Sequence, residues 1–88
     1  MMLVWTAAAW RDYVEWQHEN AKVLERINAL INEALRDPFK GMGKPEPLKR
    51  NLTGWWSRRI TGEHRMVCRL RGVQEAQALE VLAFRHHH

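Results

Sequence analysis

The sequence predicts an α+β fold in which a two-helix hairpin packs on one face of an antiparallel β-sheet. Three patterns support this prediction. Apolar residues recur at helical spacing between residues 7 and 36, they alternate with polar ones over residues 65–70, and short apolar runs occur near both ends. Strands and helices that are segregated along a chain are typical of this class. Because 88 residues suffice for one core, we expect a single domain spanning residues 1–88.

The first half of the chain is predicted to be a short strand over residues 2–5 followed by two helices. Thr6 is placed to cap the first helix, and the three alanines after it favour helix. We expect Trp10 and Trp16 to pack in the core or between the helices. Asn20 is placed to cap the second helix, which has a strong apolar stripe and ends at Asp37-Pro38.

The second half is predicted to begin with a loop from Phe39 to Pro47, which contains two glycines and two prolines. Two hairpin strands follow over residues 55–60 and 65–70, and a last strand over residues 77–85. If three residues form the hairpin turn, Arg59 stands opposite Arg65 on the same face; a four-residue turn would spoil that pairing. Arg58 then falls on the apolar face, a conflict that a bulge or a strand edge would resolve.

The positive charge of the chain is concentrated in one segment. The formal net charge is +4, but residues 1–39 carry four Lys/Arg against six Asp/Glu, whereas residues 40–71 carry nine against two. A net charge of +7 over residues 40–71 attracts polyanions such as nucleic acids. Such a field favours phosphates without specifying a sequence.

Composition and cysteine content also indicate where the protein acts. No apolar run approaches the roughly 18 residues of a membrane helix, and residues 1–5 are too short for a secretory signal. A lone cysteine, Cys68, excludes an internal disulfide and fits a reducing compartment. We therefore expect a cytoplasmic protein without membrane contact, with Cys68 as buried filler.

The carboxylate of Glu46 lies among the cations of the basic segment from Pro45 to Arg65, whose other acid, Glu63, is near its far end. Its neighbours in sequence are cationic or aromatic: Lys49, Arg50, Trp55, Trp56, Arg58, Arg59 and Arg65. Cations with interleaved aromatics suit nucleic acid, and one acid among them is a candidate proton-transfer group. Pro45 and Pro47 stiffen the backbone on both sides of Glu46. The simpler interpretation is a surface ion pair between Glu46 and Lys49 or Arg50.

Other residue types in this half have more ordinary predicted roles. We expect Trp56 in the core and Trp55 exposed at an interface, and we interpret His64 as a turn residue. The terminal run His86-His87-His88 is a poor metal site, because three adjacent side chains cannot all face one ion. The sequence predicts neither a metal site nor a cofactor.

Several blocks of the chain resemble the YoeB toxins of the RelE superfamily. The residues that carry the resemblance are Lys44-Pro-Glu-Pro-Leu-Lys49, Asn51-Leu52, Gly54, Trp56-Ser-Arg-Arg-Ile60 and Glu63-His-Arg65. The resemblance implies a microbial-ribonuclease-like fold, the RelE fold. It also implies a ribosome-dependent endoribonuclease that cleaves messenger RNA in the A site and inhibits translation. A YefM-type antitoxin, the bacterial ribosome with its mRNA and a second toxin copy are the implied partners.

The same resemblance implies a role for each candidate site residue. Glu46 corresponds to the general base, Arg65 to the transition-state stabiliser and His87 to the general acid. The scissile phosphate is held by residues that correspond to Lys49 and Arg59. His88 stands where the family ends in a tyrosine that helps to position the substrate, so this end departs from the pattern. A run of three histidines is also what a purification tag leaves, in which case His87 is not a native catalytic residue.

A second function class is compatible with the charge pattern. A basic module without catalytic activity, binding nucleic acid or protein in transcriptional autoregulation, needs the same cations. The resemblance favours the nuclease, because Glu46, Lys49, Arg59, Arg65 and His87 align with the residues that supply a base, an acid and positive charge in the YoeB toxins.

Overall fold

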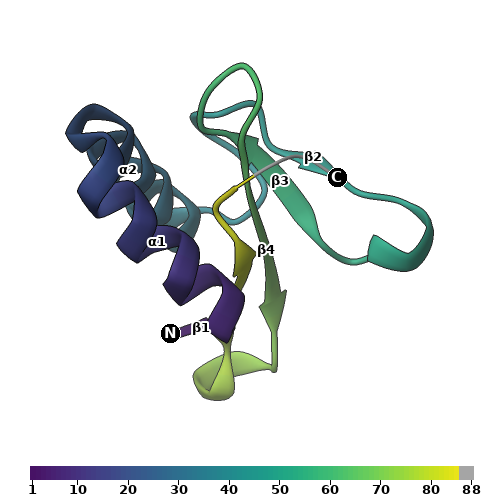
Figure 1. Cartoon of the computed structure of the whole chain (residues 1–88). Coiled ribbons are helices and arrows are strands. Elements are labelled where there is room, and N and C mark those ends of the chain that lie inside the picture. Colours follow the sequence, from purple (N-terminus) through teal and green to yellow (C-terminus); the bar gives the residue numbers. More distant parts are fainter. Residues whose placement is uncertain (86–88) are drawn as a thin grey trace.

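The computed structural model describes residues 1–85 and confirms the predicted fold class. Two helices lie on one face of a five-stranded sheet, as Figure 1 shows. The elements are β1 (Met2–Trp5), α1 (Ala7–Glu19), α2 (Ala21–Arg36), β2 (Glu46–Pro47), β3 (Trp56–Arg59), β4 (Arg65–Arg71) and β5 (Ala78–Ala83). Short 3-10 turns occur at Arg50–Leu52 and Gln74–Ala76.

The sheet is mixed rather than fully antiparallel. Its strand order is β1-β5-β4-β3-β2, in which β1 runs parallel to β5 and every other neighbouring pair is antiparallel. The amide of Met2 donates to the carbonyl of Gln77, and the amide of Thr6 donates to that of Val81, both at 3.1 Å. This pairing joins opposite ends of the chain, so no local sequence pattern reports its direction.

Both helices begin at the predicted caps. The Thr6 hydroxyl accepts a hydrogen bond from the Ala9 amide at 3.0 Å and donates to the Leu82 carbonyl at 2.8 Å. The Asn20 side chain accepts from the amides of Lys22 and Val23. Such caps satisfy amides that lack a partner within the helix. Neither helix is long and apolar enough to cross a membrane.

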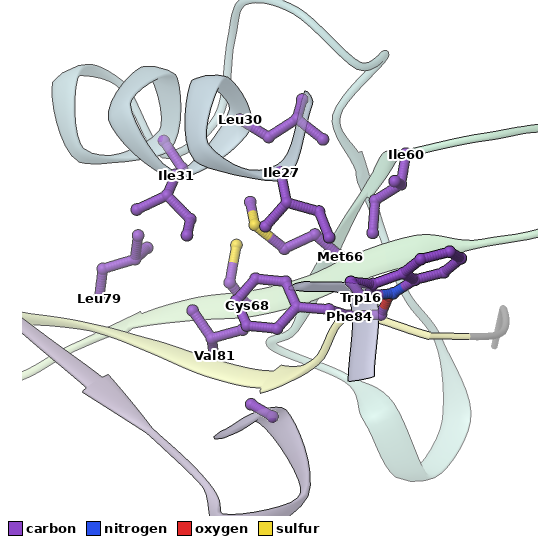
Figure 2. Close-up of a cluster of buried hydrophobic side chains, with 12 residues drawn as sticks. Trp16, Ile27, Leu30, Ile31, Ile60, Met66, Cys68, Leu79, Val81 and Phe84 are labelled. Carbon is purple, nitrogen blue, oxygen red and sulfur yellow. The ribbon is translucent and has the colours of Figure 1, made fainter. Parts of the chain in front are cut away.

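The core lies between α2 and the sheet (Figure 2). Ile27, Leu30 and Ile31 point from α2 toward side chains of β4 and β5, among them Met66 and Cys68. The prediction that Cys68 is buried filler is confirmed, since its exposed fraction is 1%. Burial raises the pKa of this thiol to about 11, and the positive charge of Arg58 partly opposes that rise.

The two tryptophans of α1 have different environments. Trp16 is buried, and its indole nitrogen donates to the Phe84 carbonyl at 2.9 Å. The prediction that Trp10 also packs in the core is wrong, because 59% of Trp10 is exposed. The buried side of α1 passes through Ala9 and Trp16, which are seven residues apart and therefore lie on one helical face. Trp10 lies off that face, where its ring is next to those of Trp5 and Tyr13.

Candidate active site

Glu46 lies on an edge strand rather than in a loop. The predicted loop from Phe39 to Pro47 ends two residues early, because Glu46 pairs with Ser57 and Pro47 with Trp56. The prolines argued against a strand, since proline cannot donate to a sheet. An edge strand tolerates it, and β2 is the last strand of the sheet. Pairing with β3 fixes the Glu46 backbone at this edge.

Arg58 holds the loop that leads to Glu46. Its side chain is fully buried on the helix side of the sheet. The guanidinium donates to the carbonyls of Asp37 at 2.6 Å, Lys40 at 2.8 Å and Met42 at 3.1 Å. These carbonyls satisfy the charged side chain that the sequence placed on the apolar face, so β3 needs no bulge. The bulge or irregularity of the sheet lies instead between β4 and β5. Burial lowers the pKa of Arg58, against nearby negative charges that raise it.

A tight turn at Gly43 and Lys44 connects this loop to β2. Both residues have positive φ, 87° and 51°. The Gly43 carbonyl accepts from the Arg59 amide at 2.6 Å. A Cβ atom at Gly43 would lie 2.7 Å from Leu30 Cδ2 and 3.0 Å from Arg58 Cβ. The backbone at residue 43 therefore fits between α2 and β3 only because glycine has no side chain.

The strand register places Glu46 and two arginines on the same face of the sheet. Glu46 pairs with Ser57, which pairs with Val67, and one step along the hairpin Arg59 pairs with Arg65. Laterally paired residues and residues two apart share a face. This face points away from the helices, because the residues that alternate with them, such as Met66, lie in the core. Strand spacings put the Cα atoms of Glu46 and Arg59 roughly 7–8 Å apart and those of Glu46 and Arg65 about 12 Å apart.

The Arg65 guanidinium is held over the hairpin turn. Its Nη1 donates to the carbonyls of Thr61 at 2.9 Å, His64 at 3.1 Å and Gly62 at 3.4 Å. Within residues 1–85, the guanidinium donates these hydrogen bonds from Nη1 alone. Its Nε and Nη2 are therefore left to donate to a ligand. The sequence left the length of this turn open. The Ile60 amide donates to the His64 carbonyl at 2.9 Å, so three residues form the turn and Arg59 pairs with Arg65.

A surface pocket of about 340 Å³ lies beside Glu46. It is lined by Glu46, Pro47, Leu48, Lys49, Arg50 and Leu52. Glu46 and Lys49 are both exposed. None of the ion pairs formed within residues 1–85 includes Glu46, Lys49 or Arg50, so the surface ion pair suggested as the simpler interpretation is not found there.

The predicted residues His87 and His88 lie outside the described residues, but the chain just before them is pinned to α1. The Phe84 amide donates to the Asp12 carboxylate at 3.0 Å. Arg85 forms ion pairs with Glu15 at 3.2 Å and Glu19 at 2.9 Å, and its guanidinium lies 4.0 Å from the Trp16 ring centre. These carboxylates had no role predicted from the sequence. Their helical spacing of three and four residues was the available signal.

Trp55 and Trp56 do not divide into one exposed and one core residue as predicted. Both are half-buried. Trp56 contacts Phe39 on the helix side, with ring centres 5.0 Å apart, whereas the Arg69 guanidinium lies over the ring of Trp55 on the other side. Within residues 1–85, no cluster of His, Cys, Asp and Glu has the geometry of a metal site.

Comparison with known proteins assigns the family. The profile described as "YoeB-like toxin of bacterial type II toxin-antitoxin system" matches residues 5–88. This chain belongs to that family. It is 54% identical to Toxin YoeB of Escherichia coli K12 over 67 residues, which cover 76% of this chain and 80% of the relative.

Solved YoeB structures share the fold along the whole chain. A YoeB/ParE toxin from Agrobacterium tumefaciens superposes with a TM-score of 0.96 at 53% identity, with full coverage of both chains. YoeB of Staphylococcus aureus, 34% identical, covers 100% of this chain and 98% of its own. Its TM-score is 0.86 as a dimer and 0.84 in a heterotetrameric YoeB-YefM complex. The resemblance to YoeB toxins is thereby confirmed.

Proposed function

We propose that this YoeB-family toxin is an endoribonuclease that cleaves messenger RNA in the ribosomal A site and so inhibits translation. The observation that supports this most is the shared face of Glu46, Arg59 and Arg65, next to a pocket that Lys49 lines. Within residues 1–85, no carboxylate forms an ion pair with Lys49, Arg59 or Arg65. These cations can therefore hold a phosphodiester on which Glu46 acts.

In the proposed reaction, Glu46 removes the proton of a ribose 2′-hydroxyl, whose oxygen attacks the adjacent phosphorus. Negative charge then develops on the phosphorane oxygens, where Nε and Nη2 of Arg65 donate hydrogen bonds and Lys49 and Arg59 add positive charge. The bond to the 5′-oxygen breaks, and that oxygen takes a proton from His87. The products are a 2′,3′-cyclic phosphate and a 5′-hydroxyl, and no metal or cofactor takes part.

The pinned residues before the terminus support the assignment of His87 as the acid. Because Phe84 and Arg85 are attached to α1 by three carboxylates, the chain two residues before His87 has a defined position. Histidine titrates near neutral pH and therefore suits proton donation. His88 would contact the substrate next to it.

Dependence on the ribosome follows from the size of the site. One small cationic face cannot order a flexible RNA strand, and loss of orientation removes much of the rate enhancement. We propose that the ribosome presents the messenger in the bacterial cytoplasm. Because the S. aureus relative is found as a dimer and with YefM, we propose that this toxin forms a homodimer and is bound by a YefM-type antitoxin.

The test is primer extension on a translated messenger with the Glu46→Gln variant. Because this change removes the base but keeps the shape of the side chain, we expect cleavage to fall by roughly 10²- to 10⁴-fold while ribosome binding is unchanged. A matched control is Glu75→Gln, an exposed carboxylate in the 3-10 turn between β4 and β5, which should cleave like wild type.

Two outcomes would contradict the proposal. If wild-type protein binds ribosomes without cutting the messenger, the chain is a binding module of the autoregulatory class. If it cuts free RNA as fast as translated messenger, the reaction does not depend on the ribosome.

A further inference from the structure

One row of the solvent-facing sheet surface carries an aromatic ring under a neutralised arginine. The pairing of Trp56 with Cys68 puts Trp55 across from Arg69, and Arg69 pairs with Glu80 on β5. The Arg69 guanidinium carbon lies 4.4 Å from the Trp55 ring centre. Its Nε donates to the Glu80 carboxylate at 2.8 Å. The ring, the guanidinium and the carboxylate form one assembly, which we call the Trp55 platform.

The Trp55 platform differs from the cations near Glu46 in that its positive charge is neutralised. Glu80 pairs with Arg69 and also with Arg71, at 3.4 Å, whereas no carboxylate within residues 1–85 pairs with Lys49 or Arg59. The Arg69 side chain remains 40% exposed although its charge is balanced. A balanced guanidinium holds phosphate weakly, but its flat face still stacks on a nucleobase, as does an indole ring.

The platform lies within reach of a nucleotide next to the proposed cleavage point. Trp55 is two residues from Ser57, the partner of Glu46, and residues two apart in a strand share a face at about 7 Å. The amide of Leu48 donates to the carbonyl of Trp55 at 2.9 Å, so the pairing of the two segments continues to this row. An RNA strand whose phosphates contact Lys49 and Arg59 therefore passes beside the indole ring of Trp55.

We propose that Trp55 and Arg69 form a stacking site for one unpaired base of single-stranded RNA, next to the linkage at Glu46. The occupant is RNA rather than a peptide because the exposed cations next to the platform, Lys49 and Arg59, form no ion pair within residues 1–85 and match a polyanion. The inference rests on the proposed function for the position of the linkage, but base stacking is measurable without cleavage.

The test measures the affinity of the full chain for a fluorescent 2′-O-methyl RNA hexamer, which cannot be cut because it lacks the attacking hydroxyl. At low ionic strength we expect Trp55→Leu to weaken binding roughly 5- to 100-fold, the range for losing one stacked base. We expect Arg69→Lys, which keeps the charge but not the plane, to weaken it several-fold. Trp10→Leu, on the helix side at an exposed tryptophan, is the matched control and should bind like wild type.

Salt dependence and abasic probes identify what the platform contacts. Trp55→Leu should leave the slope of log affinity against log salt unchanged, whereas Arg59→Ala should reduce it by about 0.7, the value for one phosphate contact on a single strand. A hexamer abasic at one position should bind wild type as weakly as the intact hexamer binds Trp55→Leu. Thermal melting of each variant checks that it is folded.

The proposal is overturned if both folded variants bind the hexamer like wild type. Loss of antitoxin affinity alone in these variants overturns it as well and assigns the platform to a peptide. Neither result affects the proposed nuclease, which is tested by cleavage with Glu46→Gln. Conversely, Glu46→Gln should bind the hexamer normally even though it does not cut.

Discussion

Arg58 and Arg59 are adjacent in the chain and in opposite environments. Arg58 is fully buried on the helix side, and its guanidinium hydrogen-bonds to three loop carbonyls. Arg59 is exposed on the other face, across from Arg65. Strand alternation sends neighbouring residues to opposite faces, so the same residue type has a structural role at one position and a proposed phosphate-binding role at the next. The charge of residues 40–71 therefore overstates the cations available to RNA.

The largest expected effect that tests this comparison is on stability. Arg58→Ala leaves three loop carbonyls without their partner, so we expect it to lower the free energy of unfolding by about 3–5 kcal/mol, measured by urea denaturation. Arg59→Ala should change it by no more than about 0.5 kcal/mol, yet reduce cleavage of translated messenger roughly tenfold or more through the lost phosphate contact. Equal stability losses in the two variants would show that burial does not distinguish them.

A smaller effect is expected where the chain passes Arg58. In Gly43→Ala the new Cβ meets Leu30 at 2.7 Å and Arg58 at 3.0 Å, at a φ of +87°. We expect a loss of about 1–3 kcal/mol from crowding and backbone strain, seen as a lower melting temperature. Gly62→Ala is the matched control, because nothing lies within 4 Å of its Cβ and its φ is not in the left-handed range. A control that is destabilised as much would refute the crowding argument.

The smallest expected effect concerns Cys68, which shares the buried face with Arg58. Burial raises the pKa of the thiol from its ordinary value of 9.0 to about 11 in the folded protein. This stability is fully present below the lower pKa and is lost as pH rises toward the higher one. The wild type should therefore lose about 2 kcal/mol more than Cys68→Ala between pH 8 and pH 11, by urea denaturation at each pH. Parallel pH profiles would mean that the thiol is not protected by burial.

Much of the fold was predictable because its signals are local. Thr6 and Asn20 cap helices through contacts within three residues, and Asp37-Pro38 ends α2 by backbone chemistry alone. The β3–β4 hairpin follows from alternation and a short turn, although only the structure decided the turn length that pairs Arg59 with Arg65. The basic segment and the acid Glu46 among its cations were also visible in the sequence, because composition and order are enough to show them.

The tertiary structure alone decided the features that join distant parts of the chain. The parallel pairing of β1 with β5, the edge strand at Glu46 and the burial of Arg58 all depend on contacts between segments that no periodic pattern connects. The same holds for the attachment of Arg85 to α1 and of Arg69 to Trp55. Sequence patterns report which face a side chain takes within its own element. Which groups satisfy a buried charge, or which ring lies under a guanidinium, is determined only when the elements pack.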